Sequence, residues 1–253
     1  VLTRRCFPWS IAPLISSSHE NNTQHAACDI SLAVPFLGRA LSGQAPGSMV
    51  WEQKWSSWET TYLMDHRVGT VPLLPGVSYV EMGRSMVKDL GNVQPYAMTN
   101  IIFQNIIFLD DTDLLGTPTI QLRYQRGAGQ ISITSRRGTS TWVTNAQMDL
   151  ELGGGERPCV DVNALRQRVG SYKEHVDAIE FYAGTGNDYR GEFRMTEGWR
   201  DESDGWGLIE YENTMTEHVH LRTCAWMDVG AHAPIWWSQH EGRPYYSAVV
   251  GEY

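Results

Sequence analysis

Periodic apolar patterns begin only after a polar start of the chain. Residues 1–30 are rich in Ser, Asn and His without regular apolar spacing, which predicts an N-terminal linker. From 34 to 58 apolar and polar residues alternate around a Gly/Pro turn, which favours short strands. After Pro75-Gly76, apolar residues recur at spacings of three and four until Gly91, which predicts an amphipathic helix. The recurring residues are Tyr79, Met82, Met86 and Leu90.

Glycine occupies position 83 inside this predicted helix, where it costs about 1 kcal/mol relative to Ala. We therefore expect the helix to approach a sheet closely at Gly83. Strand-like segments follow, with Gly and Asp at the breaks between them, as in an antiparallel meander. One long helix followed by antiparallel strands is the element order of a hotdog fold, a sheet wrapped around its helix. The predicted strands cover 99–109, 119–127, 130–138 and 141–152.

Three successive glycines at 153–155 interrupt the pattern, and 153–164 is predicted to be a Gly-rich linker. A second cycle of elements follows. Two similar units on either side of such a joint predict an α+β fold of two fused hotdogs, the first over 31–152 and the second over 165–253. The second cycle consists of a helical start in 164–186, strand-like segments at 188–200 and 206–214, and a helix candidate at 225–237.

Composition and charge mainly exclude classes of function. The 253 residues are 42% hydrophobic and 19% charged, an ordinary globular balance. A net charge of −9 argues against nucleic-acid binding, which needs clustered Lys and Arg. No apolar run approaches the roughly 20 residues of a membrane span. The four cysteines have no metal-site spacing. We expect reduced thiols, a cytoplasmic location with an organellar one left open, and a segment belonging to a larger protein.

His66 is the first candidate for chemistry. It lies in a run rich in Gly and Pro that ends at the predicted helix start, Pro75-Gly76. Free amides at a helix N-terminus can hold a developing oxyanion, so a histidine beside them is well placed to remove a proton alpha to a thioester carbonyl. Without a second motif, however, a single loop histidine is more often a bystander.

Asp228 is the second candidate. In a helix, Asp228 and His232 lie four residues apart on one face and can form a hydrogen bond. The apolar neighbours Trp226 and Met227 are expected to desolvate the carboxylate. Desolvation raises the pKa of a carboxyl, as a general acid at neutral pH requires.

Other histidines and tyrosines give weaker signals. His218 and His220 could hold a metal with Glu217, but no further ligand follows at a suitable spacing, so we predict no metal site. No nucleophile-elbow, dinucleotide-binding or phosphate-loop motif is present. Three tyrosines are interpreted as core or strand aromatics rather than catalytic acids: Tyr124, Tyr182 and Tyr189.

Taken together, these runs resemble the dehydratase domains of type I polyketide synthases. The family's first motif is HxxxGxxxxP, and HRVGTVPLLPG places Pro75 nine residues after His66. VPFLGRALSGQAPGSMVWE is similar to the family's opening HPLLG segment, and GVSYVEMG to the start of its first central helix. In the second half, FYAGTGNDYRGEFR resembles the tyrosine-bearing YGPAF segment. MDVGAH resembles the second catalytic motif, LLDxxxQ or LLDxxxH.

The resemblance implies a reaction and a set of roles. His66 becomes the general base and Asp228 the general acid for removing water from a 3-hydroxyacyl chain, which leaves a 2-enoyl thioester. The chain is carried on the phosphopantetheine arm of an acyl carrier protein, and no metal or redox cofactor is required because the protein supplies both groups. The implied partners are that carrier protein and neighbouring synthase domains, with a homodimer left open. The implied supporting residues are His232, which positions Asp228, Tyr189, which lines the pocket, and Pro75, Gly76 and Val77 near the thioester carbonyl.

Three departures from the family pattern bear on these roles. Thr70 occupies the position of the usual glycine, with Gly69 one residue earlier, so the loop is expected to bend differently. Thr223-Cys224 replaces a His-Pro pair, which could shift the start of the second helix. The chain ends at Tyr253, so either the second hotdog is truncated or its last strands lie outside this segment.

Other functions stay open at this point. The same His/Asp pair could serve a double-bond isomerase, a pyran-forming cyclase or an aromatic-polyketide product-template domain. A catalytically silent module that spaces and dimerises a synthase is the alternative from a different class. The presence of His66, Asp228 and His232 favours active chemistry over silence.

Overall fold

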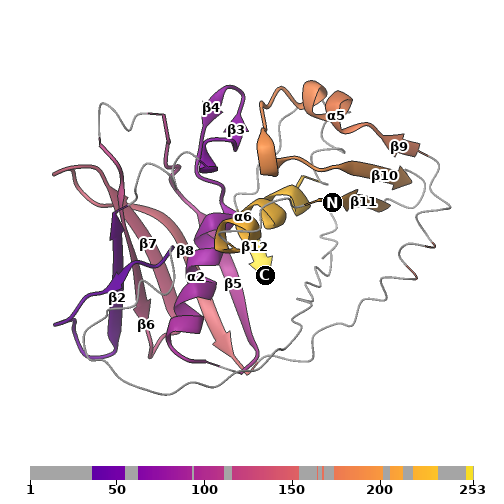
Figure 1. The fold of residues 1–253 in the computed structure, drawn as a ribbon. Coiled ribbons are helices and arrows are strands. Elements are labelled where there is room, and N and C mark those ends of the chain that lie inside the picture. The colour runs from indigo at the N-terminus through magenta and orange to yellow at the C-terminus, as the bar shows by residue number, and fades with distance from the viewer. Residues whose placement is uncertain are drawn as a thin grey trace, which may run out of the picture.

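A seven-stranded antiparallel sheet forms the largest element of the fold, in the order β1-β2-β6-β7-β8-β5-β12 (Figure 1). The computed structural model describes residues 36–54, 62–92, 94–110, 116–153, 164, 167, 174–201, 206–212, 219–232 and 249–252. The strands of this sheet are β1 (Arg39–Ala40), β2 (Ser48–Lys54), β5 (Tyr96–Phe103), β6 (Thr119–Gln125), β7 (Gln130–Arg136), β8 (Val143–Leu152) and β12 (Val249–Glu252).

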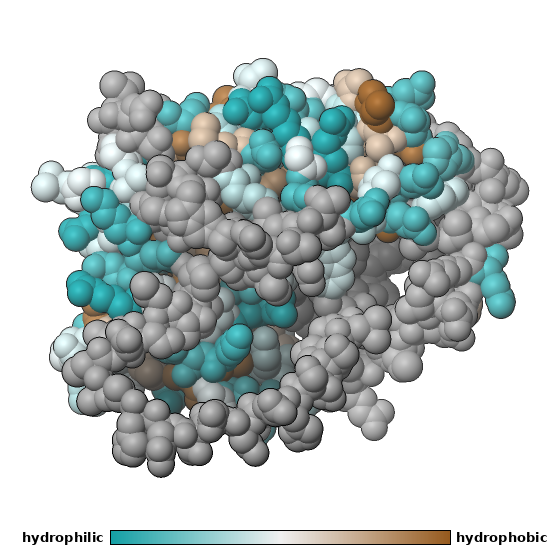
Figure 2. Space-filling model, viewed as in Figure 1, coloured by the Kyte–Doolittle hydropathy of each residue, from teal (hydrophilic) through white to brown (hydrophobic). Residues whose placement is uncertain are grey.

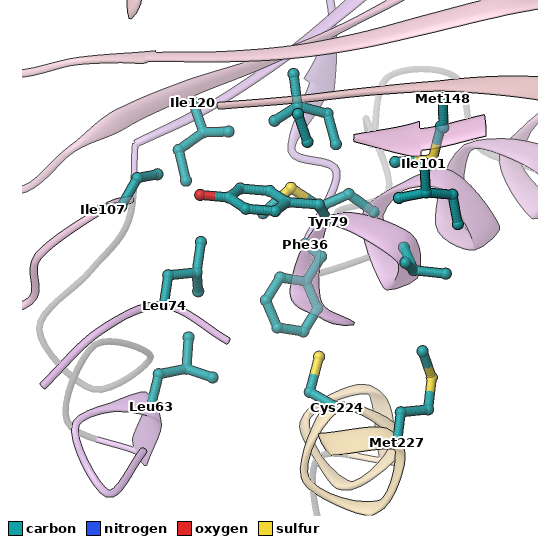
Figure 3. Packing of buried hydrophobic residues seen from close by; sticks show 14 of the residues in the cluster. Phe36, Leu63, Leu74, Tyr79, Ile101, Ile107, Ile120, Met148, Cys224 and Met227 are labelled. Carbon is teal, nitrogen blue, oxygen red and sulfur yellow. The ribbon is translucent and has the colours of Figure 1, made fainter. Parts of the chain in front are cut away.

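Helix α2 (Val77–Asp89) packs on one face of this sheet, as the helical spacing predicts. Tyr79, Met82 and Met86 are buried, because alternate residues of the strands turn their apolar side chains to the helix. Tyr79 lies beside Ile107 and Ile120 in Figure 3. The burial of these side chains removes apolar surface from water and contributes most of the stability of this layer.

The close approach expected at Gly83 is also present. A Cβ atom at this position would lie 3.0 Å from the sulfur of Met98 and 3.3 Å from that of Met148, on β5 and β8. Only a residue without a side chain lets the helix backbone come this near to the two methionines. The cost of glycine in a helix interior is therefore offset by packing.

The strand order differs from the simple meander that the sequence predicts. β6, β7 and β8 do form a meander, but β5 pairs with the far side of β8 and not with β6. β5 also ends at Phe103, so the predicted strand 99–109 is too long. Gln104 and Asn105 donate their amides to Asn145 instead of continuing the ladder. Alternation of side chains fixes which face of a strand is buried, but it does not choose the strand's neighbour.

In the second half, the described residues include a three-stranded sheet, the helices α5 and α6 and a short 3-10 helix (Figure 1). β10 lies between the other two strands, and Asp177 caps α5 by accepting the amides of Ile179 and Glu180. The elements are β9 (Glu174–Val176), α5 (Ala178–Thr185), the short 3-10 helix η1 (Gly191–Phe193), β10 (Glu197–Asp201), β11 (Trp206–Glu210) and α6 (Val219–Gly230).

Two predictions for this half need correction. The segment 188–200 is a strand only from Glu197, because its first part forms η1 and bonds to the His66 loop. The second helix begins at Val219, six residues before the predicted start, and ends at Gly230. Neither Thr223 nor Cys224 interrupts a helix as a proline would, so the turn that precedes them remains helical.

The two halves of the chain contact each other through their helices and through β12. α2 packs against α6, and Cys224 and Met227 of α6 point into the same hydrophobic cluster as Phe36 (Figure 3). β12 pairs with β5, Val250 opposite Ile101, so a strand from the end of the chain extends the first sheet. The domain boundaries stay predictions, and both predicted linkers lie mostly outside the described residues.

The surface and the thiols add little to this picture. Over the described residues visible in Figure 2, hydrophilic side chains predominate and apolar ones are scattered. Cys224 is a free, buried thiol, and the other three cysteines lie outside the described residues. None of the helices that the structure describes is long and apolar enough to cross a membrane.

Candidate active site

A tight hairpin places His66 and sets the direction of its ring. β3 (Arg67–Val68) pairs with β4 (Val71–Pro72), and the turn uses Gly69 at φ +61 beside Thr70. Gly69, which lies one residue before the glycine position of the family motif, thus supplies the residue with left-handed backbone conformation that the turn needs. His66 and Leu73 face each other at the hairpin's base, where the Leu73 amide donates to the His66 carbonyl at 3.0 Å.

The same pairing fixes the protonation of the imidazole. Nδ1 of His66 lies 2.9 Å from the Leu73 carbonyl oxygen, which only accepts hydrogen bonds. Nδ1 therefore carries a proton. In the neutral ring, Nε2 keeps its lone pair and can act as a base.

The structure brings His66 and Asp228 together from opposite halves of the chain. Nε2 of His66 lies 3.5 Å from Oδ1 of Asp228, and both residues are only 7% exposed. The other carboxylate oxygen, Oδ2, lies 3.1 Å from Nε2 of His232. His232 belongs to the turn after α6 and not to the helix itself, so the expected four-residue contact is made across the helix end.

Tyr182 of α5 is a site residue that the sequence interpretation missed. Its hydroxyl lies 3.0 Å from Nδ1 of His232 and accepts the amide of Met195 at 2.7 Å. As a buried aromatic on a helix it has the signature of a core residue, and Tyr124 on β6 is indeed one. Only a chemical argument could have pointed to Tyr182: if His232 is buried and donates a hydrogen bond from one ring nitrogen, its second ring nitrogen also needs a hydrogen-bond partner.

Aromatic rings enclose the pair. Tyr189, which the resemblance places in the pocket, is buried with its ring 5.3 Å from that of His66 and 4.4 Å from that of His232. Phe193 approaches His66 from another side at 5.7 Å. Together with Tyr182, these rings leave the two histidines little access to water, which strengthens every charge interaction in the site.

A set of backbone hydrogen bonds holds the Tyr189 segment against the His66 loop; we call this the clasp, residues 65–69 with 187–191. The amide of Asp188 donates to the carbonyl of Gly69, and the amide of Arg190 to that of Asp65, each at 2.9 Å. The Gly69 amide donates to Oδ1 of Asn187 at 2.9 Å. The clasp uses the amides of Asp188 and Arg190, and residues 191–193 form η1, so this part of the predicted segment 188–200 does not form a strand.

The N-terminus of α2 follows the hairpin directly, with Gly76 as its cap residue. The amides of Ser78 and Tyr79 turn back to the carbonyls of Pro75 and Gly76. Within the described part of the chain, the amides of Gly76 and Val77 have no backbone acceptor. Such amides at a helix start can receive an oxyanion.

The electrostatics of Asp228 differ from the sequence-based expectation. Burial raises the pKa of the Asp228 carboxyl, but attraction to His66 and the hydrogen bond from His232 outweigh it, so the pKa lies below its ordinary value. Of the two apolar neighbours expected to desolvate the carboxylate, Met227 is buried and Trp226 is 39% exposed. The prediction of a raised pKa was therefore wrong.

Metal binding has little support in the described residues. They contain no group of three or more His, Cys, Asp and Glu side chains arranged to hold a metal ion. Glu217 and His218 of the weak candidate lie outside them, and His220 is in the first turn of α6.

Part of the chain is similar to known proteins of one family. Residues 34–136 match the polyketide synthase dehydratase domain. A PKS-NRPS hybrid synthetase of Chaetomium globosum is 24% identical over 186 residues, which are 67% of this chain and 4% of that protein. A phenolphthiocerol/phthiocerol polyketide synthase of Mycobacterium tuberculosis is 28% identical over 115 residues, 44% of this chain and 5% of that protein. The chain thus spans only a small part of these relatives' length.

Solved structures show the same fold. The dehydratase domain from the CurK module of the curacin polyketide synthase superimposes with a TM-score of 0.71 at 16% identity, covering 86% of this chain and 81% of that one. The corresponding domain of the CurH module has a TM-score of 0.66 at 23% identity, covering 86% and 78%. Residues 34–136 thus match the polyketide synthase dehydratase family, and the described chain has the double hotdog fold of the solved dehydratase domains.

Proposed function

We propose that the chain eliminates water from a 3-hydroxyacyl thioester carried by an acyl carrier protein and releases the 2-enoyl thioester. The observation that carries the proposal is the facing pair: Nε2 of His66 opposite Oδ1 of Asp228, with Nδ1 occupied by the Leu73 carbonyl. The family match supports a dehydratase role in polyketide synthesis. The carrier protein and the acyl chain are parts of the proposal.

In the proposed reaction, Nε2 of His66 takes the proton from C2 of the acyl chain. The electron pair of the C2–H bond becomes the C2–C3 double bond, and the C3–O bond breaks. Asp228, in its protonated form, gives its proton to the departing hydroxyl, which leaves as water. The amides of Gly76 and Val77 are the proposed donors to the thioester oxygen, where negative charge develops.

The pair returns to its starting state without an outside acid or base. After the elimination, His66 carries an extra proton and Asp228 lacks one. Since the two atoms lie 3.5 Å apart, the proton can pass back directly once the product has left. The chain's own groups supply both proton transfers, so the proposal includes no metal or redox cofactor.

The lowered pKa of Asp228 has a consequence for this cycle. Attraction to His66 and the hydrogen bond from His232 favour the carboxylate form of Asp228. In the proposed complex an acyl chain lies between Asp228 and His66, excludes water and weakens their attraction, and both changes raise the pKa of the Asp228 carboxyl. Substrate binding thereby favours the protonated carboxyl that the reaction needs.

The test is a mass measurement on the purified chain. It is incubated with 3-hydroxyacyl thioesters of pantetheine and of an acyl carrier protein, over several chain lengths and both hydroxyl configurations. We expect the loss of one water from at least one substrate, and its disappearance in H66A and D228N. A matched control is H175A, because His175 is exposed on β9 and pairs with Glu197 rather than with a residue of the site.

Two outcomes contradict the proposal in different ways. No loss of water from any substrate removes the dehydratase assignment and leaves the silent module. Loss that persists in H66A keeps the reaction but removes His66 as its base. Isomerisation is separated by the same assay, since it moves a double bond without changing the mass, and ring formation is separated by the structure of the product.

A further inference from the structure

His232 makes two hydrogen bonds, and their directions are linked. Its Nε2 lies 3.1 Å from Oδ2 of Asp228, and its Nδ1 lies 3.0 Å from the hydroxyl of Tyr182. The residue is 2% exposed, so water offers its ring little alternative. A neutral imidazole has one N–H donor and one acceptor nitrogen. The direction of the hydrogen bond with Tyr182 therefore decides what the other nitrogen offers to Asp228.

Tyr182 is in a position to donate. Its oxygen accepts the Met195 amide at 2.7 Å, and its own O–H hydrogen is then available for Nδ1 of His232. The phenol keeps that hydrogen, because burial raises its pKa; the Met195 bond and Arg194, which lies over the ring, oppose this less strongly. The hydrogen bonds therefore run in one direction from Met195 to Tyr182, His232 and Asp228.

We infer that Tyr182 is a positioning residue that holds His232 in the tautomer with its proton on Nε2 and so determines which oxygen of Asp228 carries the acid proton. With Nε2–H donating to Oδ2, the carboxyl proton is confined to Oδ1, the oxygen that faces His66. In the opposite tautomer, the lone pair of Nε2 would face Oδ2 and draw the carboxyl proton toward His232. The acid would then point away from the base, and from the substrate between them.

The catalytic part of this inference rests on the proposed dehydration, but the tautomer can be measured without any substrate. The ¹⁵N spectrum of histidine-labelled protein distinguishes a protonated ring nitrogen from an unprotonated one. We expect His232, assigned by its absence in H232Q, to carry its proton on Nε2. Because a carboxylate only accepts hydrogen bonds, it favours the Nε2–H tautomer by itself, so the effect of Tyr182 is measured in D228N, whose neutral amide replaces the protonated acid. In D228N we expect the proton on Nε2, and in D228N/Y182F a mixture of both tautomers. A wild-type His232 protonated on Nδ1 alone, or a D228N spectrum unchanged by Y182F, would overturn the inference.

A double-variant experiment separates positioning from simple structural support. Outer partners of catalytic groups typically contribute about 10–100-fold to activity, so Y182F should lower kcat by that order with little change in KM. A glutamine at 232 donates from its amide nitrogen and has no tautomers. In the H232Q background, Y182F should therefore have no further effect on kcat. The same loss in both backgrounds would show that Tyr182 acts only by holding the Met195 backbone, and would refute the inference.

The control removes a tyrosine hydroxyl elsewhere. Y211F deletes the hydrogen bond from Tyr211 to Glu192, outside the chain of bonds that leads to Asp228. It should leave the His232 tautomer unchanged. If the wild type dehydrates no thioester, the proposed function fails while the spectrum still decides the tautomer. If it dehydrates one with His232 protonated on Nδ1, only the inference fails.

Discussion

The two halves of the chain hold their catalytic candidates by different means. His66 is oriented by a backbone carbonyl, that of Leu73, which the hairpin places opposite it seven residues later. Asp228 is oriented by a side chain, His232, which depends in turn on Tyr182 of another helix. A backbone carbonyl keeps its place whichever side chain its residue carries. A series of hydrogen-bonded side chains, in contrast, can be disrupted by a substitution at any one of them. The base is thus fixed by local structure and the acid by tertiary structure.

The largest expected effect tests whether the two sides act as one unit. H66A and D228N should each lower kcat/KM by about 10²–10⁴-fold, the usual contribution of a general acid or base. Because neither group completes the elimination alone, the double variant should be no slower than the slower single one. Steady-state kinetics on an accepted thioester measure this. If the losses of kcat/KM in the two single variants multiplied in the double variant, His66 and Asp228 would contribute independently and would not act as one unit.

The clasp between the halves provides the next test. Gly191 has φ +49, and a Cβ there would lie 2.6 Å from Oδ2 of Asp65. G191A should lower the free energy of unfolding by about 2–4 kcal/mol, from left-handed strain and overpacking together. Gly69 also has a positive φ but no atom within 4 Å of its Cβ position, so G69A should cost only about 1–2 kcal/mol. Urea unfolding of both variants measures the difference, and equal losses would mean that the clasp is loose at Asp65.

A buried carboxyl on α2, the helix that packs against α6, gives a prediction of pH-dependent stability. Glu81 of α2 is buried, and burial raises its pKa from 4.5 to about 7, although Arg84 and Lys88 oppose the shift. The folded state then binds this proton more tightly than the unfolded state, so stability falls as pH rises between these values. E81Q stays neutral and should exceed the wild type in stability by up to about 3 kcal/mol above pH 7.

Unfolding free energies from about pH 4 to pH 8 test this linkage. The two proteins should converge at the acid end, where Glu81 is protonated in both states. E180Q, at an exposed position of α5, is the matched control and should follow the wild type throughout. If E81Q and E180Q show the same pH profile, then Glu81 is ionised without penalty and the α2–α6 contact is more hydrated than its burial indicates.

The smallest expected effect concerns one hydrogen bond of the clasp. N187A removes the acceptor of the Gly69 amide but leaves the bond from Asp188 to Gly69. Its cost should be about 1 kcal/mol, the usual net value of one hydrogen bond. Chemical denaturation and kcat are the measurements. A large fall in kcat with stability unchanged would show that the clasp positions His66 catalytically, beyond joining the halves.

Much of the first half could be predicted from local patterns. The period of α2, the glycine at 83 and the strands β6, β7 and β8 follow from side-chain spacing and packing needs. The second half was predicted less well. Residues 188–196 were predicted as a strand, yet Asp188 and Arg190 bond to the His66 loop and 191–193 form η1, and α6 begins earlier than expected. The partner of β5 could not be predicted, since alternation gives a strand's buried face and not its neighbour.

The sequence by itself determined the local elements of the site. It placed His66 before a Pro-Gly helix start, seven residues from the carbonyl that orients it, and it placed Asp228 four residues before His232. The tertiary structure alone decided that His66 and Asp228 meet, that Tyr182 completes the hydrogen bonds of His232, and that the pKa of Asp228 is lowered. These three results depend on atoms distant in the chain. Spacing along a sequence encodes hairpins and helix faces, whereas contacts between halves depend on how whole layers pack.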